Sequence, residues 1–140
     1  MLSRDLTEKI ISELKDIFLD DLCSVILFGS YAKGTAQTYS DIDILIILNQ
    51  EFTHWTERQD LEIELRRKLY KKIGQVSPKV ASVKEVEMAL ENLNPLILNI
   101  IDSCIPLFDD GTFAKLKDRF DQIVPCKVVK HTDYWEVVMS

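Results

Sequence analysis

The sequence has no long apolar run and only three cysteines, which argues against a membrane protein and against a disulfide-stabilised one. A membrane-spanning helix needs about 20 consecutive apolar residues, and no segment approaches that length. Cys23, Cys104 and Cys126 are odd in number and widely spaced, which fits neither a disulfide framework nor a zinc site. The first nine residues carry charges where a signal peptide needs an apolar stretch. We therefore expect a cytoplasmic protein that makes no membrane contact.

The sequence also has fewer basic than acidic residues. Seventeen Lys and Arg residues stand against 23 Asp and Glu residues, a formal net charge of -6. Affinity for nucleic acid depends on cations that neutralise phosphates, so we do not expect nucleic acid as a partner. The densest basic stretch is Arg66, Arg67 and Lys68 with Lys71 and Lys72. We interpret it as the solvated face of a helix, and a local basic patch remains the alternative.

The balance of residue types is that of an ordinary globular domain. Apolar residues make up 46% and charged residues 29% of the 140 positions, enough to bury a core. No repeat, low-complexity linker or change of composition divides the chain. We expect residues 1–140 to form a single domain with a short helical or extended C-terminal extension.

Hydrophobic periodicity predicts a helix first and two apolar strands after it. Spacings of three and four predict a helix over residues 3–20, with Ser3 as its N-cap. Further helices are predicted at residues 56–72, 86–90, 95–101 and 113–123. Strands are predicted at residues 23–28, 42–48, 76–83 and 105–108, and a closing hairpin or an extended tail at 128–129 and 134–138. Pro78 favours an edge position for the third strand. The fold class is therefore α/β (α+β), a small mixed β-sheet flanked by helices.

Two acidic residues interrupt the start of the second apolar strand. Asp41 and Asp43 are two residues apart, so in a strand their carboxylates project from the same face. Two like charges beside buried aliphatic residues are costly unless a cation lies between them. Mg2+ or Mn2+, which prefer oxygen ligands, would fit. The alternative is that the strand begins at Ile42 and both acids lie in a solvated loop.

Gly29 and Ser30 directly follow the first predicted strand. Glycine permits a tight reversal and close approach of a ligand. The Ser30 hydroxyl and free backbone N–H groups at the start of a helical turn are able to bind a phosphate. By themselves the two residues would be an ordinary turn, but a phosphate cradle and a carboxylate pair on neighbouring strands are what a metal-bound nucleoside triphosphate requires.

This combination resembles the signature of the minimal nucleotidyltransferases, members of the DNA polymerase β-like nucleotidyltransferase superfamily. Gly29-Ser30 is followed, after ten residues, by Asp41-x-Asp43, and Lys33 also fits the pattern. The resemblance is strong over residues 25–48. A weaker likeness extends over residues 76–78, 95–96, 105–109 and 134–135.

The resemblance implies a polymerase β-like palm fold and a role for each matching residue. Gly29 and Ser30 would bind the β- and γ-phosphates, with Lys33 as a further phosphate contact. Asp41 and Asp43 would be the catalytic residues and would hold Mg2+, or Mn2+ in its place. The implied reaction transfers a nucleoside monophosphate, AMP from ATP, to a hydroxyl group.

The resemblance also implies a protein partner. Minimal nucleotidyltransferases of this kind are often encoded beside a HEPN-type toxin, and active ones transfer AMP to a tyrosine of that toxin. We therefore expect an antitoxin acting on a HEPN-type partner. A small-molecule nucleotidyltransferase is an alternative. The apolar stretch 93–107 is compatible with core packing, with the partner interface or with a homo-oligomer.

One departure from the superfamily pattern puts activity in question. The superfamily supplies a third carboxylate from a later strand, but residues 75–83 contain no acid. Glu85 and Glu87 follow, as weak candidates, because acids are expected in the first turn of a helix in any case. The remaining alternative is therefore a catalytically weak or inactive nucleotide-binding-like module that acts by binding a partner.

Overall fold

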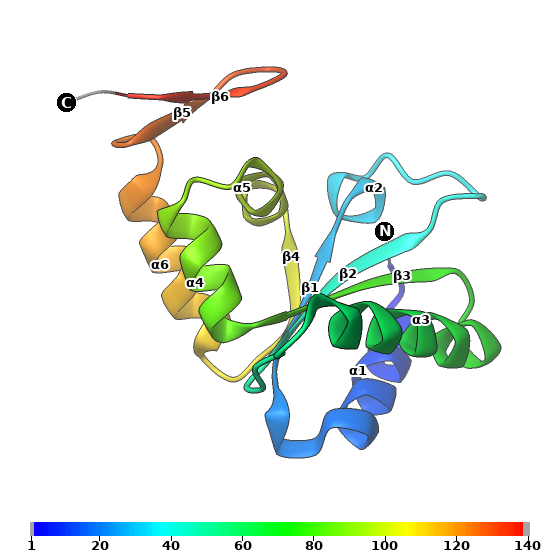
Figure 1. Cartoon of the computed structure of the whole chain (residues 1–140). Coiled ribbons are helices and arrows are strands. Elements are labelled where there is room, and N and C mark those ends of the chain that lie inside the picture. The colour runs from blue at the N-terminus through cyan, green and yellow to red at the C-terminus, as the bar shows by residue number, and fades with distance from the viewer. Residues whose placement is uncertain (1, 139–140) are drawn as a thin grey trace.

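A four-stranded mixed sheet organises residues 2–138, the part of the chain that the computed structural model describes (Figure 1). Its order is β3-β2-β1-β4. The strands are β1 (Leu22–Phe28), β2 (Ile42–Leu48), β3 (Val76–Ser82) and β4 (Ile105–Asp109). β1 is antiparallel to β2 and β4, whereas β2 and β3 are parallel. The predicted mixed sheet is confirmed.

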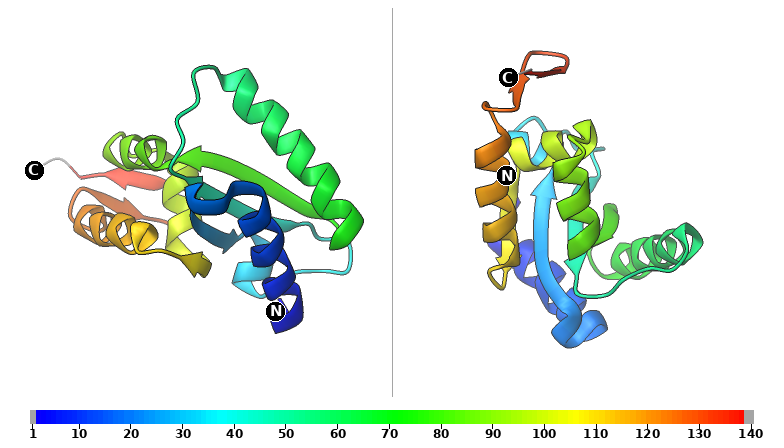
Figure 2. Two further views of the ribbon diagram at one scale, coloured as in Figure 1. Left: turned by 90° about the horizontal axis from the view of Figure 1, so that it is seen from below. Right: turned by 60° about the vertical axis from the view of Figure 1, so that its left-hand side comes forward.

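Helices cover the two faces and the β3 edge of this sheet. α1 (Arg4–Phe18) and α3 (Trp55–Lys72) pack against one side of it, and α3 runs alongside β3 (Figure 2). α4 (Val83–Glu91), α5 (Pro95–Asp102) and α6 (Thr112–Ile123) pack against the other. The short elements are the 3-10 helix η1 (Leu19–Asp21), α2 (Ser30–Lys33), β5 (Val128–Lys130) and β6 (Trp135–Val137). The hairpin β5–β6 lies away from α3 in both views of Figure 2.

The alternation of side chains in β2 separates two hydrophobic cores. Leu45 and Ile47 point towards α4, α5 and α6, whereas Ile44, Ile46 and Leu48 point towards α1 and α3. All five side chains are buried. A strand with both faces covered therefore reads as a continuous aliphatic run, which explains the sequence of residues 44–48.

Local capping fixes where the helices begin. Ser3 accepts a hydrogen bond from the Leu6 amide at 3.2 Å, so the predicted N-cap is confirmed. Ser82 and Glu85 form a reciprocal capping box, which ends β3 at Ser82 and starts α4 at Val83, earlier than predicted. β3 is an edge strand, as Pro78 indicated, and its Val80 amide donates to the Glu62 carboxylate of α3 at 2.8 Å. Among the described residues, no helix is long and apolar enough to cross a membrane.

Asp109 connects the sheet to α6, and its replacement tests the fold. The fully buried Ser24 hydroxyl donates to Asp109 Oδ1 at 2.7 Å. The same carboxylate accepts from the amides of Gly111, Phe113 and Ala114 at 2.9–3.1 Å. Asp109→Ala removes this cap and leaves the Ser24 hydroxyl unpaired, so we expect urea denaturation to give a free energy of unfolding lower by about 3 kcal/mol.

The matched control for that experiment is Asp118→Ala, an exposed carboxylate within α6. We expect it to change the free energy of unfolding by less than about 0.5 kcal/mol. Equal losses from the two variants would contradict the structural role given to Asp109.

Candidate active site

A strained glycine turns the chain from β1 into α2. Gly29 has φ 73° and ψ -152°, a conformation that L-residues rarely adopt. Its carbonyl accepts from the amides of Ala32 and Lys33 at 3.1 Å, which closes the first turn of α2. The amides of Ser30 and Tyr31 stand at the start of this turn, where a helix has no internal acceptors for them. They are therefore able to donate to an anion.

The same glycine leaves room for a carboxylate on the neighbouring strand. Phe28 pairs with Asp43 across β1 and β2, which places Asp43 beside Gly29. A Cβ atom built on Gly29 would lie 2.3 Å from Asp43 Oδ2. No side chain fits at that distance, so residue 29 must be glycine if Asp43 is to keep its position.

The two acids occupy different environments. β2 begins at Ile42, so Asp41 precedes the strand and is exposed, whereas Asp43 belongs to the strand and is half-buried. The loop alternative therefore describes Asp41, and the strand prediction describes Asp43. The alternation of the chain still directs both residues to the same side.

Burial raises the pKa of Asp43 above its ordinary value, and the negative charge of Asp41 raises that pKa further. The positive charges of Lys79 and Arg66 act in the opposite direction without cancelling the rise. The positive charges near Asp43 therefore do not fully offset the cost of ionising it in the folded chain. A cation bound between the two carboxylates would relieve both causes.

This pKa shift predicts how stability changes with pH when Asp43 is replaced by Asn. A carboxyl whose pKa is raised in the folded state makes the protein less stable as the pH rises from the unfolded-state pKa towards the folded-state pKa. Asp43→Asn removes that loss. We expect the metal-free variant to melt at a higher temperature than the native protein at pH 7, with the gain shrinking as pH falls and vanishing below the unfolded pKa of Asp. Calorimetry with EDTA measures it, and an unchanged gain at low pH would contradict it.

The donor set fits one magnesium ion shared with a nucleotide. Carboxylate oxygens are hard donors, and Mg2+ is usually held by one or two carboxylates together with substrate phosphates. Asp41 and Asp43 supply such a pair. Within residues 2–138 no cluster of three His, Cys, Asp or Glu side chains is suitable for a metal. The site therefore lacks an all-protein cage.

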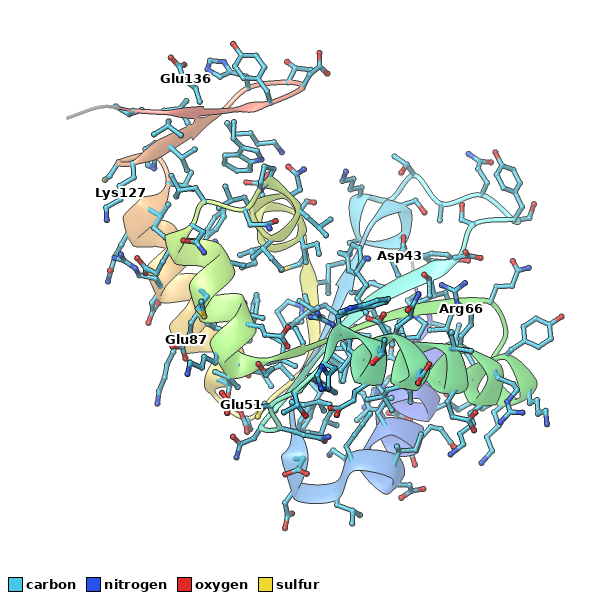
Figure 3. The ribbon with its side chains drawn as sticks, in the orientation of Figure 1. Asp43, Glu51, Arg66, Glu87, Lys127 and Glu136 are labelled. Atoms are coloured by element: carbon cyan, nitrogen blue, oxygen red, sulfur yellow. The ribbon has the colours of Figure 1, made fainter. Side chains whose placement is uncertain are left out.

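Ser77 stands where a third carboxylate would face the pair. It is the β3 residue in register with Asp43. Its hydroxyl accepts a hydrogen bond from Arg66 Nη2 at 3.1 Å. Figure 3 shows Arg66 on α3 at the same end of the sheet as Asp43. A serine and an arginine thus occupy the position on β3 beside Asp43, and no acid belongs to β3.

Glu85 and Glu87, the weak candidates for a third ligand, lie at the wrong end of the sheet. β2 and β3 run in parallel from Asp43 and Ser77 to Leu48 and Ser82. At about 3.3 Å per residue, those five steps put the start of α4 roughly 16 Å beyond Asp43. Glu85 is also engaged, in the α4 capping box and in an ion pair with Arg58. Figure 3 shows Glu87 on α4, far from Asp43.

The structure brings Gly29, Ser30, Asp41 and Asp43 to one end of the sheet and leaves Lys33 exposed at the end of α2. From the sequence, Arg66 was interpreted only as part of a basic stretch on a helix, because nothing local in that stretch links it to the Asp41 and Asp43 pair. Its importance comes from the packing of α3 against β3, which joins residues 11 positions apart.

A glycine-serine turn beside an Asp-x-Asp strand on a mixed sheet is the arrangement expected of a nucleotidyltransferase. The chain belongs to the nucleotidyltransferase domain family, whose profile matches residues 7–107. It is an enzyme of the transferase class by that membership. The protein adenylyltransferase candidate MJ1305 of Methanocaldococcus jannaschii is 33% identical over 115 residues, which cover 79% of this chain and 75% of that protein. A second candidate from the same organism, MJ0604, is 34% identical over 79 residues, 56% of this chain and 72% of that protein.

Solved structures share the fold. A chain of a toxin–antitoxin complex with AMP-PNP superposes with a TM-score of 0.56 at 18% identity, covering 84% of this chain and 85% of that chain. A complex described as a tri-AMPylated Shewanella oneidensis HEPN toxin with its MNT antitoxin gives a TM-score of 0.53 at 15% identity, covering 86% of each chain. At these identities the likeness establishes the polymerase β-like nucleotidyltransferase fold.

Proposed function

We propose that the protein is a Mg2+-dependent adenylyltransferase that moves AMP from ATP to a tyrosine hydroxyl of a HEPN-type partner, as an antitoxin. The observation that carries the proposal is the contact between Gly29 and Asp43. A turn suited to phosphates and a carboxylate suited to a metal meet without space for even one extra carbon atom. That closeness is what a triphosphate bound to both groups requires.

Each site residue has a distinct task in this reaction. The Ser30 hydroxyl and the amides at the start of α2 bind the β- and γ-phosphates, and Lys33 contacts them from the end of α2. Asp41 and Asp43 would hold Mg2+. When bound, Mg2+ supplies the positive charge that the α-phosphate and the departing pyrophosphate need. Asp43, fixed in β2 by its neighbours, orients the triphosphate relative to the acceptor.

The identity of the acceptor is supported by the relatives' names. MJ1305 and MJ0604 are named as adenylyltransferases that act on protein. Two similar folds come from toxin–antitoxin complexes, one with AMP-PNP and one with a tri-AMPylated HEPN toxin. A protein acceptor also suits a chain in which the described residues form little beyond the catalytic sheet and its helices. We place this reaction in the cytoplasm, where ATP and Mg2+ are abundant.

The test is mass spectrometry of the partner after co-expression and co-purification. With the native protein we expect a partner tyrosine that carries one adenylyl group, and with Asp41→Asn we expect an unmodified partner. An identical modification with both proteins, or a phosphoryl group in place of AMP, would refute the proposal.

A second candidate function is a binding module that has lost activity. Ser77 and Arg66 in place of the third carboxylate favour this reading, because the superfamily's second metal site would lose a ligand. The two candidates differ in their dependence on Asp43. If Asp43→Asn leaves both the partner complex and neutralisation of the toxin intact, the module is the better description. Loss of neutralisation with the complex intact favours the enzyme.

A further inference from the structure

Arg66 and Lys79 border a cavity that lies next to the carboxylate pair. Neither the cavity nor these two cations has a role in the reaction proposed above. The cavity has a volume of about 370 Å³, within the usual range for small-molecule sites, and lies between α3 and the start of β3. Arg66 donates to Ser77, while Lys79 is exposed two residues further along β3, on the same face as Ser77. Ser77 is in register with Asp43, so Arg66 lies beside the acid pair, and Lys79 follows two residues later on β3.

The only acid that lines this cavity among the described residues, Glu62, is engaged elsewhere. Its carboxylate accepts a hydrogen bond from the Val80 amide at 2.8 Å, which caps the free edge of β3. Asp41 and Asp43 approach from the β2 side, where the metal is proposed to bind. Arg66 and Lys79 are therefore the cations available to an anionic group that enters from the β3 side.

The order of the strands determines which anionic group of the reaction would enter from the β3 side. Gly29, Asp43 and Ser77 lie side by side at one end of the sheet, where β1 ends and β2 and β3 begin, since Phe28 pairs with Asp43 and Asp43 with Ser77. In the proposed reaction the β- and γ-phosphates lie over Gly29 and Ser30. Phosphoryl-type transfer needs the attacking and leaving oxygens in line across the phosphorus atom. If pyrophosphate leaves towards β1, the acceptor oxygen must attack from above β3, where Arg66 and Lys79 lie.

We propose that Arg66, assisted by Lys79, binds the ionised acceptor oxygen. On the acceptor side, these two cations would then take the place of a third carboxylate and of the metal ion that a third carboxylate would hold. The inference rests on the proposed adenylyl transfer. The acceptor is a phenol that releases its proton to solvent before attack. Its oxygen forms a bond to the α-phosphorus as the bond from that phosphorus to the bridging oxygen breaks, and pyrophosphate leaves. The guanidinium and ammonium groups stabilise the phenolate that a second metal would otherwise stabilise.

The kinetic test compares acceptors of different acidity. N-acetyltyrosinamide and its 3,5-difluoro analogue, whose phenol is more acidic, are offered with Mg2+ and ATP labelled at the α-phosphate. We expect Arg66→Met to lower kcat/KM about 100-fold for the tyrosine compound, as for removal of one oxyanion donor. The loss should fall below about tenfold for the fluorinated compound, which ionises without help. Equal losses for both acceptors, or no loss, would overturn the inference.

Arg67→Met is the matched control, because Arg67 neighbours Arg66 on α3 but pairs with Glu64 instead of approaching Asp43. We expect this variant to keep the native kcat/KM for both acceptors. A loss equal to that of Arg66→Met would show a general effect of the charge of α3, and would also overturn the inference.

A spectroscopic titration separates this inference from the proposed function, because it needs no turnover. N-acetyl-3-nitrotyrosinamide, whose phenolate absorbs visible light, is titrated with the protein, Mg2+ and an ATP analogue that cannot be cleaved between the α- and β-phosphates. The charged groups that line the cavity are Arg66, Lys79 and Glu62, and Asp41 and Asp43 lie beside it, across from Ser77. We expect the native protein to lower the apparent pKa of the probe by roughly 1 to 3, and Arg66→Met with Lys79→Met to abolish the effect.

The outcomes are distinct. A probe that does not bind, or that ionises identically with native protein and double variant, overturns the inference even if AMP transfer is found. A lowered pKa that depends on Arg66 supports the inference, and absence of AMP transfer to any acceptor would then count against the proposed function alone.

Discussion

Asp43→Asn is expected to lower the rate of AMP transfer by about three orders of magnitude or more. The substitution keeps the shape of the side chain but removes the negative charge that we propose would hold Mg2+ against the triphosphate. A metal ion supplies several kcal/mol of transition-state stabilisation, and each 1.4 kcal/mol is about tenfold in rate. Asp43 is half-buried in β2 and lies against Gly29, and no other described acid is placed to take over its position. Single-turnover transfer from α-labelled ATP measures the effect.

The control for Asp43→Asn is Asp118→Asn, which removes an exposed carboxylate on α6, away from the site. We expect that control to transfer AMP at the native rate. A melting temperature of metal-free Asp43→Asn at or above that of the native protein would exclude unfolding as the cause of its inactivity. Retention of more than about a tenth of the native rate would contradict the metal-holding role of Asp43.

Gly29→Ala has the second large expected effect, on both activity and stability. The new methyl carbon would stand 2.3 Å from Asp43 Oδ2, so the carboxylate must move away from the turn. The backbone at φ 73° adds strain of about 1–2 kcal/mol for a residue with a Cβ atom. We expect AMP transfer to fall at least about 100-fold, since small displacements in a site are that costly. The free energy of unfolding should fall by about 2–4 kcal/mol.

Gly34→Ala distinguishes displacement of Asp43 from backbone strain as the cause of the lost activity. Gly34 ends α2 at φ 76°, a similarly unfavourable backbone angle, but a Cβ atom there meets nothing within 4 Å. We expect this variant to lose about 1 kcal/mol of stability and to retain most of its transfer activity. If Gly34→Ala were as inactive as Gly29→Ala, backbone strain around α2, and not displacement of Asp43, would be the cause.

The sequence was sufficient for those features that depend on short-range patterns. Continuous apolar runs placed β1 and β2, and apolar spacings of three and four placed the helices, within a few residues, because both cores are built from these side chains. The spacing of Gly29-Ser30 and Asp41-x-Asp43 led to the family. It also led to the four residues that the structure gathers at one end of the sheet.

The remaining features depend on contacts between distant segments. The closeness of Gly29 to Asp43 follows from the pairing of Phe28 with Asp43, which no local pattern specifies. The parallel register of β2 and β3 places Ser77 beside Asp43 and moves Glu85 to the opposite end. Arg66 reaches Ser77 only because α3 packs along the edge strand. These long-range contacts decide which side chain replaces the third carboxylate.

The most direct measurement of the central claim is a pair of label-transfer reactions with the native protein, Mg2+ and the co-purified partner. One uses ATP labelled at the α-phosphate and the other ATP labelled at the γ-phosphate. We expect label to enter the partner only from the α position, and pyrophosphate to be released in equal amount. Label entering from the γ position would indicate phosphoryl transfer, and a stable partner complex with no label from either position would indicate a binding module. Either result would contradict adenylyl transfer by the Gly29, Asp41 and Asp43 site.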